Sequence, residues 1–265
     1  MNYTAKDHTF VVCAYKESPY LEKCIHSLQK QTTLSNIIIS TSTPCEHISA
    51  IADKYNLPLI ISEWPTGIAN DWNYAYTHVS TPLVTIAHQD DIYLPDYLTT
   101  ILDAVNKADS PLIAFTGYGE LRGKKAVYSN QLLNIKKLLL FPLQFKPLQK
   151  SKFIRRRCLS LGSCICCPSV TFIKENLPEK PFKSELKSNL DWQAWEEISR
   201  LDGQFVYCKK PLMLHRIHEE SETSRIIGDN KRGSEDYYMF KRFWPTPIAK
   251  LINKVYSSGE KSNEL

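Results

Sequence analysis

The stretch Pro82-Leu83-Val84-Thr85-Ile86-Ala87-His88-Gln89-Asp90-Asp91 decides the fold that we expect for this chain. Its first six residues predict a buried strand, and Leu94-Pro95-Asp96 predicts the start of a helix soon after it. Two adjacent carboxylates therefore stand at the C-terminal end of a strand, where open α/β sheets bind ligands. Adjacent carboxylates favour a hard cation such as Mg²⁺ or Mn²⁺, which completes its shell with water and phosphate oxygens. The pattern predicts a nucleotide-diphosphate ligand, unless Asp90 and Asp91 only cap the following helix.

Strand and helix patterns alternate along the first half of the chain. Buried strands are predicted at 9–14, 36–40, 59–61, 82–87 and 111–116, and amphipathic helices are predicted between them, starting at Ser18-Pro19, Thr43 and Gly67. This alternation predicts parallel βαβ units and an α/β fold with a doubly wound, mostly parallel central sheet and helices on both faces. Later segments predict a helix at 189–200, short strands at 205–207 and 212–215, a last helix from Thr246, and disorder from Ser257.

Composition narrows the class of protein. The chain has 265 residues, of which 43% are hydrophobic and 23% charged, as in an ordinary globular domain. It contains neither GxGxxG nor GxxxxGK[ST], which argues against a dinucleotide-binding enzyme and a Walker-type NTPase. A polar N-terminus and eight cysteines predict a cytoplasmic protein with free thiols, and no apolar run is long enough to predict a transmembrane helix.

The segment from Glu120 to Arg157 is strongly basic. It contains eleven Lys and Arg residues against the single acid Glu120, and it includes the apolar run Leu138–Leu143. Such a segment can lie on an anionic membrane, as can the last helix beside Phe240-Lys241-Arg242-Phe243-Trp244, and both can equally be solvated surface. Peripheral membrane contact is therefore one expectation, whereas no recognisable module predicts nucleic-acid binding.

Several motifs, taken in order, carry a resemblance to a known family. They are Tyr15-Lys16-Glu17, Gly67-Ile68-Ala69-Asn70-Asp71-Trp72-Asn73, Ala87–Asp91, Gly162 with Cys167-Pro168-Ser169, Asn189-Leu190-Asp191-Trp192, and His215–His218 with Ser221 and Thr223. Over residues 8–225 the chain resembles the family 2 glycosyltransferases of the GT-A fold, and 226–265 would form a C-terminal helical extension with a flexible tail. Two departures are His88, where the metal motif often begins with a carboxylate, and Leu190, where the base motif usually has Glu.

The resemblance implies a site for a nucleotide-diphosphate sugar. The donor-binding residues that it implies are Ala14, Tyr15, Glu17, Thr41, Asp71, Asn73, Asp90, Arg216 and His218. Asp91 is expected to be the main ligand of Mn²⁺ or Mg²⁺, with Asp90 as a second ligand or a ribose contact. Residues 40–43 lack the Asp that usually contacts the base, so the base stays open.

Catalysis needs a group that takes the proton of the acceptor hydroxyl, and Asp191 is the expected base. Asp191 can alternatively serve as a plain N-cap, and Trp192 and Trp195 either stack on the acceptor sugar or pack into the core. The implied activity is inverting, metal-dependent transfer from a UDP- or dTDP-sugar to a glycan or polyprenyl-linked acceptor in surface polysaccharide biosynthesis. The rival readings are a nucleotidyltransferase, which lacks support because no Gly-rich loop follows the first strand, and a catalytically impaired sugar-nucleotide-binding or scaffold protein on the same fold.

Overall fold

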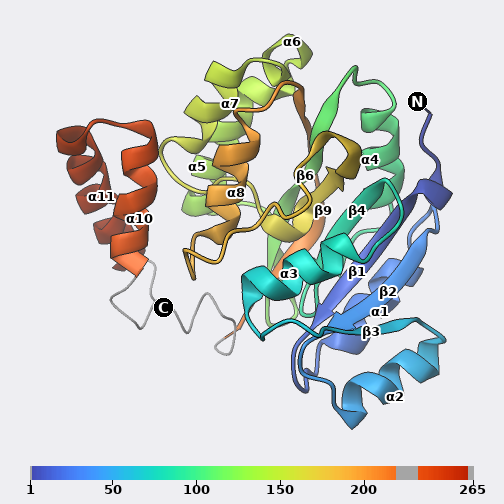
Figure 1. The fold of residues 1–265 in the computed structure, drawn as a ribbon. Coiled ribbons are helices and arrows are strands. Elements are labelled where there is room, and N and C mark those ends of the chain that lie inside the picture. The colour runs from blue at the N-terminus through green and yellow to red at the C-terminus, as the bar shows by residue number, and fades with distance from the viewer. Residues whose placement is uncertain (1, 219–231, 262–265) are drawn as a thin grey trace.

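The computed structural model describes residues 2–218 and 232–261 (Figure 1). Within them, one sheet contains β1 (His8–Ala14), β2 (Asn36–Thr41), β3 (Leu59–Ile61), β4 (Leu83–His88), β5 (Ile92–Tyr93), β6 (Pro111–Arg122), β7 (Lys125–Val127), β8 (Val170–Ile173) and β9 (Gln204–Ile217). The helices are α1 (Leu21–Gln29), α2 (Glu46–Tyr55), α3 (Ile68–Thr77), α4 (Tyr97–Val105), α5 (Gln131–Leu140), α6 (Lys146–Gln149), α7 (Lys152–Leu159), α8 (Leu190–Ile198), α10 (Arg232–Phe243) and α11 (Thr246–Lys261). Short 3₁₀ helices are η1 (Ala5–Asp7), η2 (Phe141–Gln144), η3 (Cys167–Ser169) and η4 (Lys174–Asn176).

The strand order is β3-β2-β1-β4-β8-β6-β9-β5, with β7 paired to β6. β1 runs parallel to β2 and β4, so Ala14 aligns with Thr41 and Cys13 aligns with His88 at one edge of the sheet. The expected doubly wound α/β fold is confirmed. The antiparallel strand β8 between β4 and β6 was not expected, because its four residues include the polar Thr171 and are too few to identify a strand.

Helices cover both faces of the sheet, as expected (Figure 1). Alternating residues of β1 point to opposite faces: Phe10 and Val12 join the core under α1, α2 and α4, whereas Val11 joins the core under α3, α7 and α8. Both cores consist of buried side chains, and the strand ends lie between them.

The C-terminal helices are packed onto this second core. Met239, Phe240 and Phe243 of α10 and Ala249 of α11 are buried in it. The expected boundary at residue 226 and the residues Ser221 and Thr223 lie outside the described part of the chain. The expected disorder from Ser257 is wrong for 257–261, because α11 continues to Lys261.

Three local expectations also differ from the structure. The first helix begins at Leu21 and not at Ser18-Pro19, and Cys45, whose side chain makes no capping bond, precedes α2. The two short strands expected at 205–207 and 212–215 are one long strand, β9, since β6 pairs with it along its whole length. No helix in the described residues is both long and apolar enough to cross a membrane.

Candidate active site

The ends of β1 and β4 are joined by the side chain of Gln89. The backbone N–H of Tyr15 donates to Gln89 Oε1 (2.9 Å), and Gln89 Nε2 donates to the carbonyl of Tyr15 (3.1 Å). Lys16 then takes a left-handed conformation (φ 53°), and its N–H donates to Thr43 Oγ1 (2.7 Å). The Thr43 N–H donates to Thr41 Oγ1 (3.0 Å), which ties the end of β2 to the same loop. The structure thus brings Ala14, Tyr15 and Thr41 together at one edge, while Glu17 is exposed in the loop beyond them.

Asp91 is a buried anchor for β9. Its Oδ1 atom accepts hydrogen bonds from the backbone N–H of Arg216 (2.9 Å) and from His215 Nδ1 (3.0 Å). Burial disfavours the charged imidazole, but the adjacent Asp91 carboxylate outweighs it and raises the pKa of His215. The Oδ2 atom of Asp91 is buried, lies 3.9 Å from His88 Nδ1, and has no hydrogen-bond partner among the described residues.

Asp90 lies on the more open side of the same turn. Its Oδ2 atom is 2.9 Å from His218 Nε2, and each of the two side chains keeps 18% of its surface exposed. Arg216 Nε donates to the carbonyl of Asp90 (2.7 Å), and its guanidinium stacks 4.4 Å from the ring centre of Tyr20. Asp90, Arg216 and His218 therefore form one polar cluster at the carboxyl end of β4.

The cluster fits a divalent cation in part. A carboxylate oxygen of Asp90 and an imidazole nitrogen of His218 are suitable donors for Mn²⁺, and the carboxylate of the adjacent Asp91 adds negative charge. Asp91 as the main ligand stays a prediction: its carboxylate is fully buried and its Oδ1 atom already binds β9, which leaves its Oδ2 atom for a cation. Across residues 2–218 and 232–261 no three His, Cys, Asp or Glu side chains are grouped as metal ligands, so water and phosphate oxygens would have to complete the shell.

His88 packs under the strand end. Its ring stacks on Trp72 at 4.9 Å with an interplanar angle of 20°, and burial lowers its pKa to about 4. A neutral, stacked imidazole at this position holds α3 against β4.

Asp71 and Asn73 of α3 have different environments. Asn73 is buried and binds the backbone of Phe182 in both directions, by Nδ2 to the carbonyl (2.6 Å) and by Oδ1 from the N–H (3.1 Å). The prediction that Asn73 binds donor is therefore wrong for this structure, since both of its polar atoms hold the loop before α8. Burial raises the pKa of Asp71, which lies beside Ser42 at the end of β2. Ser42 belongs to residues 40–43, where this chain lacks the Asp that usually contacts the base.

Asp191 is in the first turn of α8 and is half-buried. Asn189 is the N-cap residue of this helix, so Asp191 is not a plain N-cap; its Oδ1 accepts the N–H of Trp192 (2.6 Å). Burial raises the pKa of the Cys166 and Cys167 thiols, and the negative charges of both Asp91 and Asp191 raise these pKa values further. Both carboxylates therefore lie close to the segment that enters η3.

The expected acceptor contacts of Trp192 and Trp195 are wrong, because both side chains have no exposed surface. Trp192 Nε1 donates to the carbonyl of Leu159 (2.9 Å), and its ring packs against Phe240 of α10. Trp195 packs against Phe172 of β8. Both tryptophans stabilise the core beneath Asp191.

Sequence reasoning missed the residues that hold Asp191 in place from α10. Glu235 accepts hydrogen bonds from the backbone N–H groups of Lys187 (2.8 Å), Ser188 (2.8 Å) and Asn189 (3.2 Å). Asn189 Nδ2 also donates to Asp236 Oδ1 (2.7 Å). These contacts join residues more than 40 positions apart, and no local sequence pattern predicts them.

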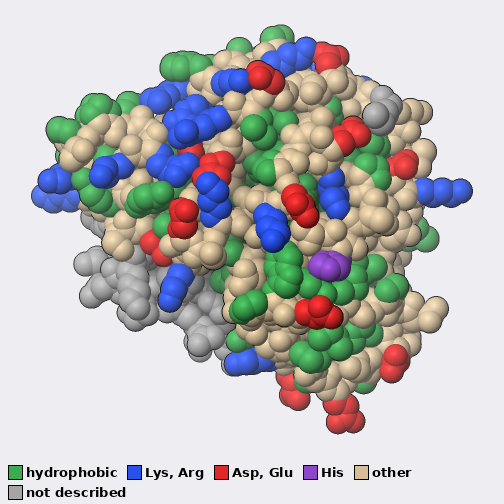
Figure 2. Space-filling view, in the orientation of Figure 1, with side chains coloured by type: hydrophobic (Ala, Val, Ile, Leu, Met, Phe, Trp, Pro, Cys, Tyr) green, Lys and Arg blue, Asp and Glu red, His purple; other side chains and the backbone are tan. Residues whose placement is uncertain are grey.

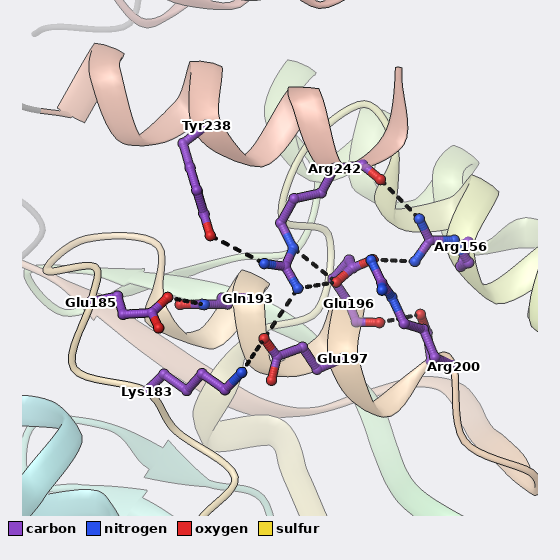
Figure 3. Close-up of polar contacts among 10 residues, drawn as sticks. Arg156, Lys183, Glu185, Gln193, Glu196, Glu197, Arg200, Tyr238 and Arg242 are labelled. Atoms are coloured by element: carbon purple, nitrogen blue, oxygen red, sulfur yellow. Dashed lines mark hydrogen bonds and ion pairs between the residues drawn. The ribbon is translucent and has the colours of Figure 1, made fainter. Parts of the chain in front are cut away.

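Glu196, further along α8, is a second such anchor (Figure 3). It is fully buried and forms ion pairs with Arg156 of α7, Arg200, and Arg242 of α10 (2.7 Å). Burial alone would raise the pKa of Glu196, but the hydrogen bonds from the three arginines lower it overall. α7, α8 and α10 are thereby locked together behind the site.

The α/β sheet, the acidic turn after β4 and the carboxylate of α8 together define a glycosyltransferase of the GT-A type. The family model described as "Glycosyl transferase family 2" matches residues 9–176, and the chain belongs to this family. It is 24% identical over 262 residues to an uncharacterized glycosyltransferase of Haemophilus influenzae, covering 87% of this chain and 74% of that one.

Two solved structures show the same fold. The S. aureus TarS fragment 1–349, in complex with UDP-GlcNAc, superposes with a TM-score of 0.61 at 15% identity, over 93% of this chain and 70% of that one. The mannosyltransferase PcManGT of Pyrobaculum calidifontis, in complex with GDP-Man and Mn²⁺, gives 0.60 at 14% identity, over 96% and 70%. The expected family, fold and enzyme class are therefore confirmed.

Proposed function

We propose that this glycosyltransferase moves a sugar from a nucleotide-diphosphate donor, UDP- or dTDP-linked, to a glycan acceptor with inversion and with the help of Mn²⁺ or Mg²⁺. The observation that carries the proposal is the cluster of Asp90, Arg216 and His218 at the edge where β1, β2 and β4 end. The complexes of TarS with UDP-GlcNAc and of PcManGT with GDP-Man and Mn²⁺ support it.

The departing diphosphate gains negative charge as the bond to the anomeric carbon breaks. A bound divalent cation supplies positive charge for this diphosphate. Arg216 is fixed for the same task, because its Nε binds the Asp90 carbonyl and its guanidinium plane rests on Tyr20. Asp90, His218 and the Oδ2 atom of Asp91 would hold the cation, and the Oδ1 atom of Asp91 keeps the Arg216 backbone in register through its 2.9 Å hydrogen bond.

The acceptor hydroxyl must lose a proton as it attacks the anomeric carbon. Asp191 would take that proton, since it is half-buried and lies near the same Cys166–Cys167 segment as Asp91. A base opposite the leaving group gives in-line attack and therefore inversion.

The further proposal is that the acceptor is a polyprenyl-linked glycan used in surface polysaccharide biosynthesis. In that case the enzyme works in the cytoplasm, as a peripheral protein at the inner face of the cell membrane. The basic and apolar segment that follows β7 supports this part of the proposal.

Release of nucleoside diphosphate from a panel of nucleotide sugars tests the proposed reaction. Asp191→Asn should lower kcat by about 10²–10⁴ while donor binding is retained. Asp103→Asn, an exposed change on α4, is the matched control and should keep full activity. Full activity in Asp191→Asn would refute the assignment of the base.

A further inference from the structure

The outer surface formed by α5, η2 and α7 is unusually apolar for a solvent-facing surface. Leu138 is 72% exposed and Phe153 is 68% exposed, and other large apolar side chains on these elements are exposed as well. The further members are Leu132 and Ile135 of α5, Phe141 of η2, and Phe145, which directly follows η2. We call these six side chains the α5–α7 apolar surface.

α5 is apolar on two sides. Leu133 and Leu140 are buried against the core, whereas Leu132, Ile135 and Leu138 recur every three residues on the solvent side. An amphipathic helix that only covers a core would carry polar residues on the solvent side. The exposed apolar stripe of α5 therefore indicates a surface that binds a partner.

The charge around this surface is positive. No Asp or Glu occurs between Glu120 and Glu175, whereas Lys137, Lys146 and Arg157 accompany the apolar side chains. Asp109 and Asp202, from other elements, pair with Lys150 and Lys152 and leave the segment with an excess of positive charge. Figure 2 shows Lys and Arg side chains gathered among hydrophobic ones in its upper left part, where Figure 1 places α5–α7 and the C-terminal helices.

We propose that the α5–α7 apolar surface inserts into the headgroup region of an anionic membrane, with the surrounding lysines and arginines on the lipid phosphates. Apolar side chains next to Lys and Arg are the combination that binds such an interface. α11 adds Ile248, Leu251 and Val255, exposed at helical spacing, and Arg157 stacks on Trp244 directly before it.

The position of this surface agrees with a lipid-borne acceptor. On its inner side α5 packs over β6 and Cys164–Cys166, with Lys136 donating to the Tyr118 hydroxyl (2.9 Å). The charges of Asp91 and Asp191 both raise the pKa of the Cys166 thiol. The inference deepens the proposed function, because it names the surface that would bring the enzyme to a lipid-linked acceptor.

Vesicle flotation of the full chain, without donor or acceptor, tests the inference. Vesicles of phosphatidylcholine with phosphatidylglycerol should bind the protein, vesicles of phosphatidylcholine alone should bind it far less, and salt should weaken binding. The double variant Leu138→Glu with Phe153→Glu should lower binding roughly tenfold or more. Leu34→Glu is the matched control, because Leu34 is 64% exposed on another part of the molecule and its change should leave binding intact.

Equal binding of the double variant and the original chain, or no binding to anionic vesicles, would overturn the inference. A dimer in sedimentation velocity that the double variant dissolves, without vesicle binding, would instead assign the surface to a second copy of the chain. A thermal shift with nucleotide diphosphate, run on each variant, separates these outcomes from failure of the proposed function. The double variant should keep that shift, since neither residue touches the site.

Discussion

Ser188, just before α8, gives two hydrogen bonds to Glu235 of α10: its N–H (2.8 Å) and its hydroxyl (2.6 Å) both donate to Oε2. Together with the N–H groups of Lys187 and Asn189, they make Glu235 an acceptor for a whole turn of backbone. These contacts lower the pKa of Glu235 although burial opposes them. The loop that leads to Asp191 is thus held from a helix more than 40 residues away in sequence.

Glu235→Gln should lower kcat by about ten- to a hundredfold while the KM for the nucleotide sugar stays unchanged, because small misplacement of a base is costly. The amide keeps one acceptor oxygen but turns the other into a donor that faces backbone N–H groups. Steady-state kinetics with a fixed acceptor measure the split between kcat and KM. Glu179→Gln, on the exposed loop before α8, is the control. An equal rise of KM and fall of kcat would argue against a role in positioning Asp191.

Glu196→Gln should lower the free energy of unfolding by about 3–5 kcal/mol, since it leaves three guanidinium groups around a neutral, fully buried side chain. Glu197→Gln is a matched control on the same helix, because Glu197 is partly exposed and its pairs contribute about 0–1 kcal/mol. Urea unfolding at pH 7 compares the two variants. A loss of equal size in both would contradict the special role of Glu196.

The pH dependence of stability should carry a contribution from His8. This residue is fully buried, its ring nitrogens bind Ser35 Oγ (2.9 Å) and Thr85 Oγ1 (2.8 Å), and burial lowers its pKa to about 3. Between pH 6.5 and pH 3, His8 is protonated in the unfolded chain but neutral in the folded chain. The contribution of neutral His8 to the free energy of unfolding is therefore fully present above pH 6.5 and is lost as the pH falls toward 3. As the pH falls through this range, the free energy of unfolding decreases by up to about 1.4 kcal/mol per pH unit.

Urea unfolding between pH 7 and pH 4 measures this slope. His8→Gln should show a shallower fall of the free energy of unfolding than the original chain does. Parallel curves for the two proteins would contradict the burial of a neutral His8.

The sequence predicted those parts of the fold that depend on local pattern. The apolar runs of β1, β2 and β4 and the helical stripes between them were enough for the parallel half of the sheet, and they placed Asp90 at its edge. Contacts between distant segments were not predictable in this way. Asp91 is buried against β9 whereas Asp90 stays on the open side of the turn. This difference depends on Arg216 of β9, which lies 125 residues after Asp91 in the sequence.

The burial of individual side chains was the second feature that the sequence could not predict. Trp192 and Trp195 follow Asp191 on a short helix, and the sequence alone allowed them to face either the acceptor or the core. The packing of α10 and β8 decides for the core. Asn73 likewise stands in a motif, but its partner is the backbone of Phe182, 109 positions away.

The most direct test of the central claim is nucleotide binding measured by thermal shift, with UDP, dTDP and GDP, each with and without Mn²⁺. We predict that one nucleotide raises the melting temperature only when Mn²⁺ is present, and that Asp90→Asn loses this shift while Asp103→Asn keeps it. A shift that is unchanged in Asp90→Asn, or no shift with any nucleotide, would contradict a donor and metal site at Asp90 and His218.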